Sequence, residues 1–172
     1  EPGPMRAAPP CAHFGRCGGC TLQHVAMDAY LAWKRDLVVT ALKQRGFADV
    51  PVDEIRAVAP GTRRRANFKA QLQGDGVALG FYEAGSRVLV DLKECPVLDP
   101  VIVTAVEKLR EIARLAMPEG QGGRLVVTRL DRGLDVSFDN GVKDLAPQVR
   151  AELAAPAQAG QYVADSSEIA HA

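Results

Sequence analysis

The sequence contains little that would indicate a membrane-bound or extended protein. Its 172 residues include no long apolar run, and Glu1 to Pro4 lack the basic start and apolar stretch of a secretory signal. Neither sign of charge is in excess, because 21 Lys and Arg residues balance 21 Asp and Glu residues. With 47% hydrophobic and 24% charged residues, the composition argues against fibres, coiled coils and disordered tails. It favours a soluble, cytoplasmic globular protein with no membrane partner.

Common catalytic motifs are also missing. No Gly-rich turn follows a strand pattern and opens a helix, which is the arrangement that binds a nucleotide-containing cofactor. No Ser or His lies in the sequence context of a catalytic triad. The residues taken alone therefore predict a binding module with no catalytic residue.

Cysteine is scarce, but its distribution is informative. Cys11, Cys17 and Cys20 lie within ten residues, and Cys95 follows much later. The lack of a secretion signal argues against disulfides and for metal or redox chemistry. The three glycines between Cys11 and Cys20 allow tight turns and present backbone N–H groups to sulfur. We interpret this segment, called the Cys loop below, as metal-binding.

The spacing favours iron and sulfide over zinc. Three clustered cysteines with one remote cysteine are typical of iron–sulfur proteins, and Pro96 follows Cys95 as prolines do in ferredoxin motifs. Zinc, with His13 or His24 as a further ligand, remains an alternative. The alternative functions are a zinc-stapled structural RNA-binding module, an iron–sulfur redox protein and a radical enzyme that uses S-adenosylmethionine.

The hydrophobic pattern predicts an α+β fold. Helical spacing extends over 27–45 and 100–116, with a weaker helix at 146–155. Predicted strands are 54–58, 63–72, 77–82, 87–92, 124–130, 134–138 and 161–164. We expect a mostly antiparallel sheet with the helices packed on one face, and the Cys loop stapled to that sheet by a metal cluster that includes Cys95.

A local excess of positive charge is the second candidate site. Between Ile55 and Gly74 there are five basic residues and no acidic one before Asp75. Arginine suits phosphate, and an aromatic ring can stack on an unpaired base. Salt bridges to Glu54, Asp75 or Glu83 are the alternative. The candidate RNA-binding residues are Arg63, Arg64, Arg65, Lys69, Phe68 and His24.

Four separated segments resemble one known family in order and spacing. They are Cys11-Ala-His-Phe-Gly-Arg-Cys-Gly-Gly-Cys-Thr-Leu-Gln-His24, Arg63-Arg64-Arg65-Ala66, Gly80-Phe81-Tyr82 and the stretch from Val90 to Leu98. They resemble the central part of the iron-sulfur RNA uracil-5-methyltransferases, which methylate ribosomal RNA. The resemblance implies that Cys11, Cys17, Cys20 and Cys95 hold a 4Fe-4S cluster. Thr62 stands where that family usually has an aromatic residue.

The resemblance also implies that the chain is a fragment of a longer enzyme. We expect residues 1–10 to be a linker from a missing β-barrel domain and 11–165 to be the cluster-bearing domain. We expect 166–172 to lead to a missing methyltransferase domain. S-adenosylmethionine and the catalytic residues would belong to that missing domain, so this chain alone would be inactive. Its partners would be ribosomal RNA and the other domains of the same parent chain.

Overall fold

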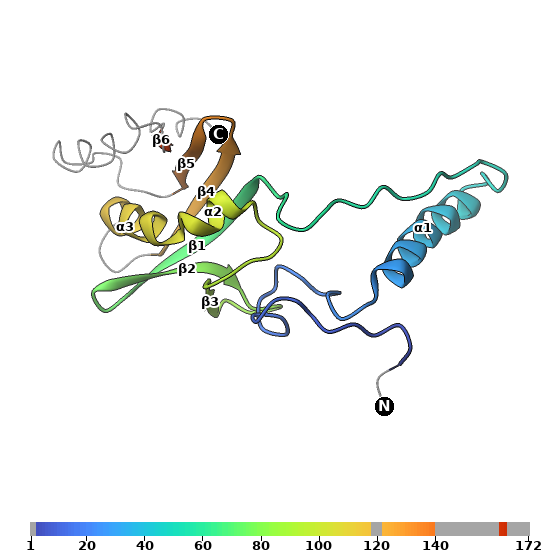
Figure 1. Cartoon of the computed structure of the whole chain (residues 1–172), viewed down its shortest axis with the longest axis horizontal. Coiled ribbons are helices and arrows are strands. Elements are labelled where there is room, and N and C mark those ends of the chain that lie inside the picture. Colours follow the sequence, from blue (N-terminus) through green and yellow to red (C-terminus); the bar gives the residue numbers. More distant parts are fainter. Residues whose placement is uncertain (1–2, 118–121, 140–161, 165–172) are drawn as a thin grey trace.

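The core of the protein is one six-stranded sheet (Figure 1). The structure is a computed structural model, and it describes residues 3–117, 122–139 and 162–164. The strands are β1 (Arg65–Gln73), β2 (Gly76–Tyr82), β3 (Leu89–Asp91), β4 (Gly122–Leu130), β5 (Gly133–Asp139) and β6 (Tyr162–Ala164). Their order is β3-β2-β1-β4-β5-β6, and every neighbouring pair is antiparallel except β5 and β6. The prediction of an α+β fold with a mostly antiparallel sheet is confirmed.

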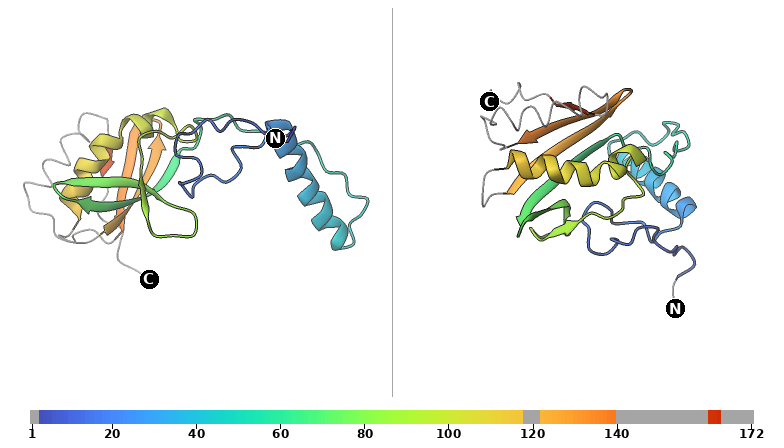
Figure 2. Two further views of the ribbon diagram at one scale, coloured as in Figure 1. Left: turned by 90° about the horizontal axis from the view of Figure 1, so that it is seen from below. Right: turned by 60° about the vertical axis from the view of Figure 1, so that its left-hand side comes forward.

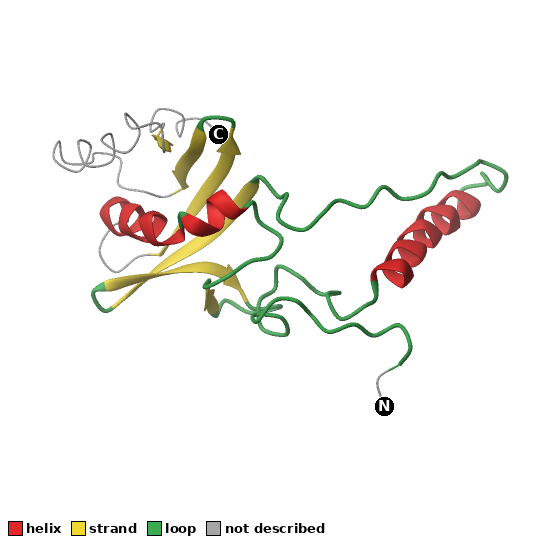
Figure 3. Ribbon diagram, viewed as in Figure 1, coloured by secondary structure: helices red, strands yellow, loops and turns green. Residues whose placement is uncertain are grey.

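Two short helices cover one face of this sheet (Figures 1 and 3). Helix α2 spans Pro100–Thr104 and α3 spans Val106–Ala116. Asp99 caps α2, since its Oδ1 accepts a hydrogen bond from the Val101 N–H at 2.9 Å. The sequence predicts a single helix over 100–116. The helix is interrupted at Ala105, where ψ is −6° and departs from the α-helical value, and α3 begins at the next residue.

Burial along β1 alternates as expected for a strand with one covered face. Ala66, Phe68 and Ala70 are buried and face the helices, whereas Arg65 lies on the opposite face. The apolar side of α3, which includes Leu109, completes the core against these residues. The basic residues at odd positions of β1 therefore lie on the face that α2 and α3 leave uncovered.

Helix α1 (Met27–Gln44) does not belong to this layered core. It stands away from the sheet, joined to it by long extended segments (Figure 2). None of its residues is buried, and large apolar side chains such as Trp33 and Val38 are about half exposed. The helix itself was predicted, but the expectation that the helices pack on one face of the sheet is wrong for α1. In the part of the chain that the structure describes, no helix is long and apolar enough to span a bilayer.

Other predicted elements agree less well with the structure. Residues 54–58, predicted as a strand, form part of an extended connection with no strand partner among the described residues (Figure 3). These five residues are all exposed, so no burial of their side chains stabilises a strand here. The predicted helix at 146–155 lies outside the described residues. At the N-terminal end, Met5 and Ala7 bond to Ala26 and His24, so this part of the predicted linker is paired with the chain that follows the Cys loop.

One arginine fastens α3 to the sheet. The Arg110 side chain is only 15% exposed, and its guanidinium donates to the carbonyl oxygens of Val77 (2.9 Å) and Leu92 (2.8 Å). It also pairs with the carboxylate of Asp91. These contacts fix the end of β3, from which the chain runs directly to Cys95.

We expect Arg110→Met to lower the free energy of unfolding by about 2–3 kcal/mol, because it removes the hydrogen bonds to Val77, Asp91 and Leu92, worth about 1 kcal/mol each. Urea denaturation followed by circular dichroism measures the change. The matched control is Arg114→Met, an exposed position on the same helix, where the effect should stay within about 0.5 kcal/mol. Equal losses in the two variants would show that the Arg110 contacts contribute nothing specific.

Candidate metal centre and basic surface

The four cysteines lie around one cavity at the end of the sheet, although one of them is remote in sequence. The cavity is lined by Cys11, Cys17, Cys20 and Cys95 together with His13, Phe14, Gly19, Gln23, Arg63, Phe81, Leu92, Glu94, Val97 and Leu98. All four thiols are free and half-buried. The residues that sequence spacing grouped as ligands are thus brought to one place by the fold.

One side of the Cys loop is fixed to the end of β2. The Gly18 N–H donates to the carbonyl oxygen of Tyr82 at 2.8 Å, and Cys17 forms a bridge with Glu83. Glu83 also accepts from the Arg16 guanidinium at 3.3 Å. Gly18 is needed for this approach, because a Cβ there would lie 2.8 Å from the Tyr82 oxygen. Glycine at this position therefore allows contact between backbones.

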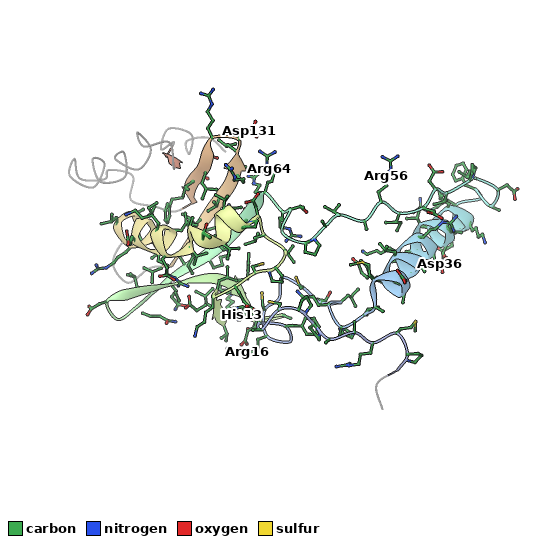
Figure 4. The ribbon with its side chains drawn as sticks, viewed as in Figure 1. His13, Arg16, Asp36, Arg56, Arg64 and Asp131 are labelled. Atoms are coloured by element: carbon green, nitrogen blue, oxygen red, sulfur yellow. The ribbon has the colours of Figure 1, made fainter. Side chains whose placement is uncertain are left out.

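The other side of the loop meets the segment that carries Cys95. The Ala12 N–H donates to Oε1 of Glu94 at 2.6 Å. In return, the Lys93 N–H donates to Nε2 of His13 at 3.1 Å. His13 lies beside the end of the sheet, close to Arg16 (Figure 4). These bonds join parts of the chain that are far apart in sequence and place the neighbours of Cys11 next to the neighbours of Cys95.

The sulfur atoms have polar as well as apolar surroundings. The Gly19 N–H donates to Sγ of Cys17 at 3.4 Å, a contact of the kind that the glycine content predicted. Burial raises the pKa of the Cys11 thiol, and the nearby Cys95, Glu94 and Cys17 raise it further, while a backbone hydrogen bond from His13 opposes them. In the absence of a metal, Cys11 is therefore a protonated thiol at neutral pH.

The distances between metal-ligating side chains determine whether they can hold a single metal ion. Over residues 3–117, 122–139 and 162–164, no three His, Cys, Asp or Glu side chains converge closely enough to hold one metal ion. A zinc ion requires its sulfur ligands about 2.3 Å from a single point. The four cysteines line a cavity that also has apolar walls, such as Phe81 and Leu98, and their side chains do not have the close arrangement of a zinc site.

The three consecutive arginines have different surroundings. Arg63 lines the cavity beside the cysteines. Arg64 turns to the β4–β5 hairpin, where it donates to the carbonyl oxygen of Arg129 at 3.0 Å and pairs with Asp131 at 3.2 Å (Figure 4). Arg65 lies exposed on the uncovered face of the sheet. The alternative that these arginines pair with Glu54, Asp75 or Glu83 is wrong for Arg64, whose partner is Asp131, and Glu83 pairs with Arg16 instead.

Lys69 shares the uncovered face with Arg65. It lies directly opposite Arg124 of β4 in the strand register, and its ammonium lies 5.7 Å from the centre of the Tyr82 ring. The uncovered face therefore carries a basic strip made of Arg65, Lys69 and Arg124, which is called the basic strip below.

Two of the residues predicted to contact RNA lie against other aromatic rings. Phe68 is completely buried and packs against Phe81 with ring centres 5.3 Å apart, so the prediction that it stacks on a base is wrong. The His24 ring packs against Phe14 at 5.5 Å, and its buried Nδ1 has no hydrogen-bond partner among the described residues; its contact with RNA stays a prediction. The alternation of Ala66, Phe68 and Ala70 is the sequence signal that would have assigned Phe68 to the core.

Sequence reasoning missed the residues that hold the Cys loop in place. His13 was considered as a zinc ligand and Glu83 as a partner of the basic stretch, whereas each fixes the loop to the sheet. Glu94 was not singled out at all. No short-range pattern reveals these pairs, because each joins residues that are far apart in the sequence.

Comparison with known proteins gives relatives of one kind. No protein-family model matches the chain. An uncharacterized RNA methyltransferase of Brucella suis is 43% identical over 155 residues, which is 90% of this chain and 37% of the relative. One from Caulobacter vibrioides is 39% identical over 140 residues, which is 80% of this chain and 34% of the relative. The 23S rRNA (uracil(1939)-C(5))-methyltransferase RlmD of Halomonas elongata is 41% identical over 108 residues, which is 62% of this chain and 22% of the relative.

These similarities cover most of this chain but a minor part of each relative. The chain spans 37% of the length of the Brucella suis protein. Levels of 39–43% identity over more than a hundred residues establish common ancestry. The chain is therefore homologous to one part of proteins named RNA methyltransferases.

Proposed function

We propose that this chain, a homologue of RNA methyltransferases, is the iron–sulfur cluster-bearing RNA-recognition domain of a cytoplasmic rRNA uracil-C5 methyltransferase. The observation that carries the proposal is the gathering of Cys11, Cys17, Cys20 and Cys95 around one cavity. The name of the Halomonas elongata relative supports 23S rRNA as the substrate class. The domain would extend over residues 11–165.

In this proposal the four thiolates are the ligands of a 4Fe-4S cluster. When bound, such a cluster supplies four metal–sulfur bonds to the protein, which would staple the Cys loop to the end of the sheet. Phe81, Leu92 and Leu98 supply apolar walls to the cavity, and the Gly19 N–H would stabilise negative charge on Cys17. In this proposal Arg63 lies beside the stapled loop.

The methylation itself would take place in another part of the longer protein. Binding of S-adenosylmethionine and the catalytic residues belong, in this proposal, to the length of the relatives that this chain does not match. The contribution of this chain is to bind and orient RNA. By itself it is expected to have no methyltransferase activity.

Metal analysis tests the cluster directly. After anaerobic reconstitution with ferrous iron and sulfide, we expect about four irons per chain and broad visible absorbance. A matched sample reconstituted with zinc should remain less stable to heat than the iron-loaded sample. A colourless protein that retains one zinc per chain and no iron would refute the cluster and favour the zinc-stapled structural module.

The basic strip is expected to contact the RNA phosphates. Replacing both Arg65 and Lys69 with Gln should weaken binding to a single-stranded rRNA fragment and reduce the slope of log K against log salt by about 0.7 per lost contact. The matched control is Arg56→Gln, an exposed arginine on the segment between α1 and β1, which points away from the sheet (Figure 4). An unchanged slope in the double variant would show that the strip does not bind phosphate.

A further inference from the structure

We propose that His13 and Glu94 are positioning residues that hold Cys95 against Cys11 before any cluster is bound. The inference rests on the proposed function, because it concerns how the four proposed ligands come together. It assigns a role to two side chains that are not ligands themselves.

Two reciprocal hydrogen bonds carry the proposal. The side chain of Glu94 accepts from the backbone of Ala12 at 2.6 Å, and the side chain of His13 accepts from the backbone of Lys93 at 3.1 Å. The residues next to Cys11 are thus bonded to the residues that precede Cys95. Neither bond involves a sulfur atom, so both exist without a metal.

Each end of this contact is attached to a different part of the molecule. The Cys95 segment is fixed to the residues just before β1, because the Gly61 N–H donates to the Pro96 oxygen at 2.8 Å and the Arg63 N–H donates to the Val97 oxygen at 3.1 Å. The Cys17 end of the loop is fixed to β2 through Gly18. Cys11, at the other end of the loop, depends on the His13 and Glu94 bonds for its place beside Cys95.

The hydrogen bonds of His13 and Glu94 would bring the ligands together during folding, so that metal binding does not have to provide the free energy for this step. Bringing together thiols from distant parts of a chain costs conformational entropy. Bringing them together as thiolates also costs electrostatic repulsion. Groups that are already in place react as if at high local concentration, so a site held by His13 and Glu94 should acquire iron and sulfide faster than a loose one.

Cross-linking of the metal-free chain tests the positioning without a cluster. In the full chain with Cys17→Ser and Cys20→Ser, Cys11 and Cys95 are the two remaining thiols. A bis-maleimide reagent should bridge them within one molecule, and mass spectrometry gives the rate. We expect Glu94→Ala and His13→Ala each to slow bridging about five- to tenfold, the factor expected for one lost hydrogen bond.

Conservative variants separate the hydrogen bonds from general damage to the fold. Glu94→Gln keeps an acceptor oxygen and His13→Gln places one near the former Nε2, so both should restore most of the bridging rate. Lys93→Ala is the matched control, because it leaves the donating backbone N–H in place and should have no effect. Gln variants as slow as the Ala variants would overturn the role of these hydrogen bonds.

A second measurement separates this inference from the proposed function. In the chain with all four cysteines, anaerobic cluster assembly should be slowed by the Ala variants and restored by the Gln variants. A wild-type chain that takes up no iron would refute the proposed function, whatever its cross-linking rate. Unchanged cross-linking in both Ala variants would refute the positioning role, even if the wild-type cluster forms normally.

Discussion

Phe68→Ala is expected to lower the free energy of unfolding by about 3–5 kcal/mol. The side chain is completely buried between the sheet and the helices and packs against Phe81. Removing it leaves a cavity that rigid neighbours on β1, β2 and α3 cannot fill. Chemical denaturation of the full chain measures the loss.

The control for this variant is Asn67→Ala, its exposed neighbour on the opposite face of β1, which should change stability by less than about 0.5 kcal/mol. Phe68→Leu tests the earlier idea that the ring binds RNA. Leucine keeps most of the core but removes the aromatic ring, so RNA affinity should remain as in the wild type. A large loss of RNA affinity in a stably folded Phe68→Leu protein would contradict our assignment of Phe68 to the core alone.

Cys95→Ser is expected to remove most of the reconstituted iron, from about four atoms per chain to less than one. A serine hydroxyl is a poor substitute for a thiolate toward iron, and the described residues around the cavity include no further cysteine. Iron content and visible absorbance after desalting measure the effect. The metal-free variant should unfold at nearly the wild-type denaturant concentration, since the two side chains differ by one atom.

The same variant distinguishes the proposed domain from a radical enzyme. Radical enzymes that use S-adenosylmethionine leave one iron of the cluster without a protein ligand and rely on three cysteines. If Cys95→Ser kept a full cluster on Cys11, Cys17 and Cys20, that class would be favoured and our ligand set would be wrong. Loss of the cluster supports a site in which the remote cysteine is the fourth ligand.

Local sequence patterns predicted the parts of the fold whose stability is local or periodic. Leu109, Ile112 and Ala116 recur at helical spacing, and all three are buried on α3. Asp131 to Gly133 marked the turn between β4 and β5, which pair as a hairpin. The four cysteines line one cavity, with Cys95 shortly after β3, whereas their role as metal ligands stays a prediction.

Patterns along the chain could not show which surfaces meet. The apolar spacing of α1 predicted a helix correctly, but it contains no information on what the helix packs against, and none of its residues is buried. The bonds from His13 and Glu94 likewise depend on distant backbone groups. The prediction for Phe68 was wrong for a different reason. Its neighbours Arg65 and Lys69 are basic and suggested RNA contact, but Phe68 alternates with them along β1 and lies on the buried face.

The path of the chain around α1 has a consequence for how this protein can vary. The chain that contains α1 begins after the Cys loop and returns at Gly61, which is bonded to Pro96 beside Cys95. The segments that lead to and from α1 both extend away from the sheet on the same side (Figures 1 and 2). Since α1 has no buried residue and the sheet is formed by other segments, substitutions of exposed apolar residues on α1 are expected to leave the strand register unchanged.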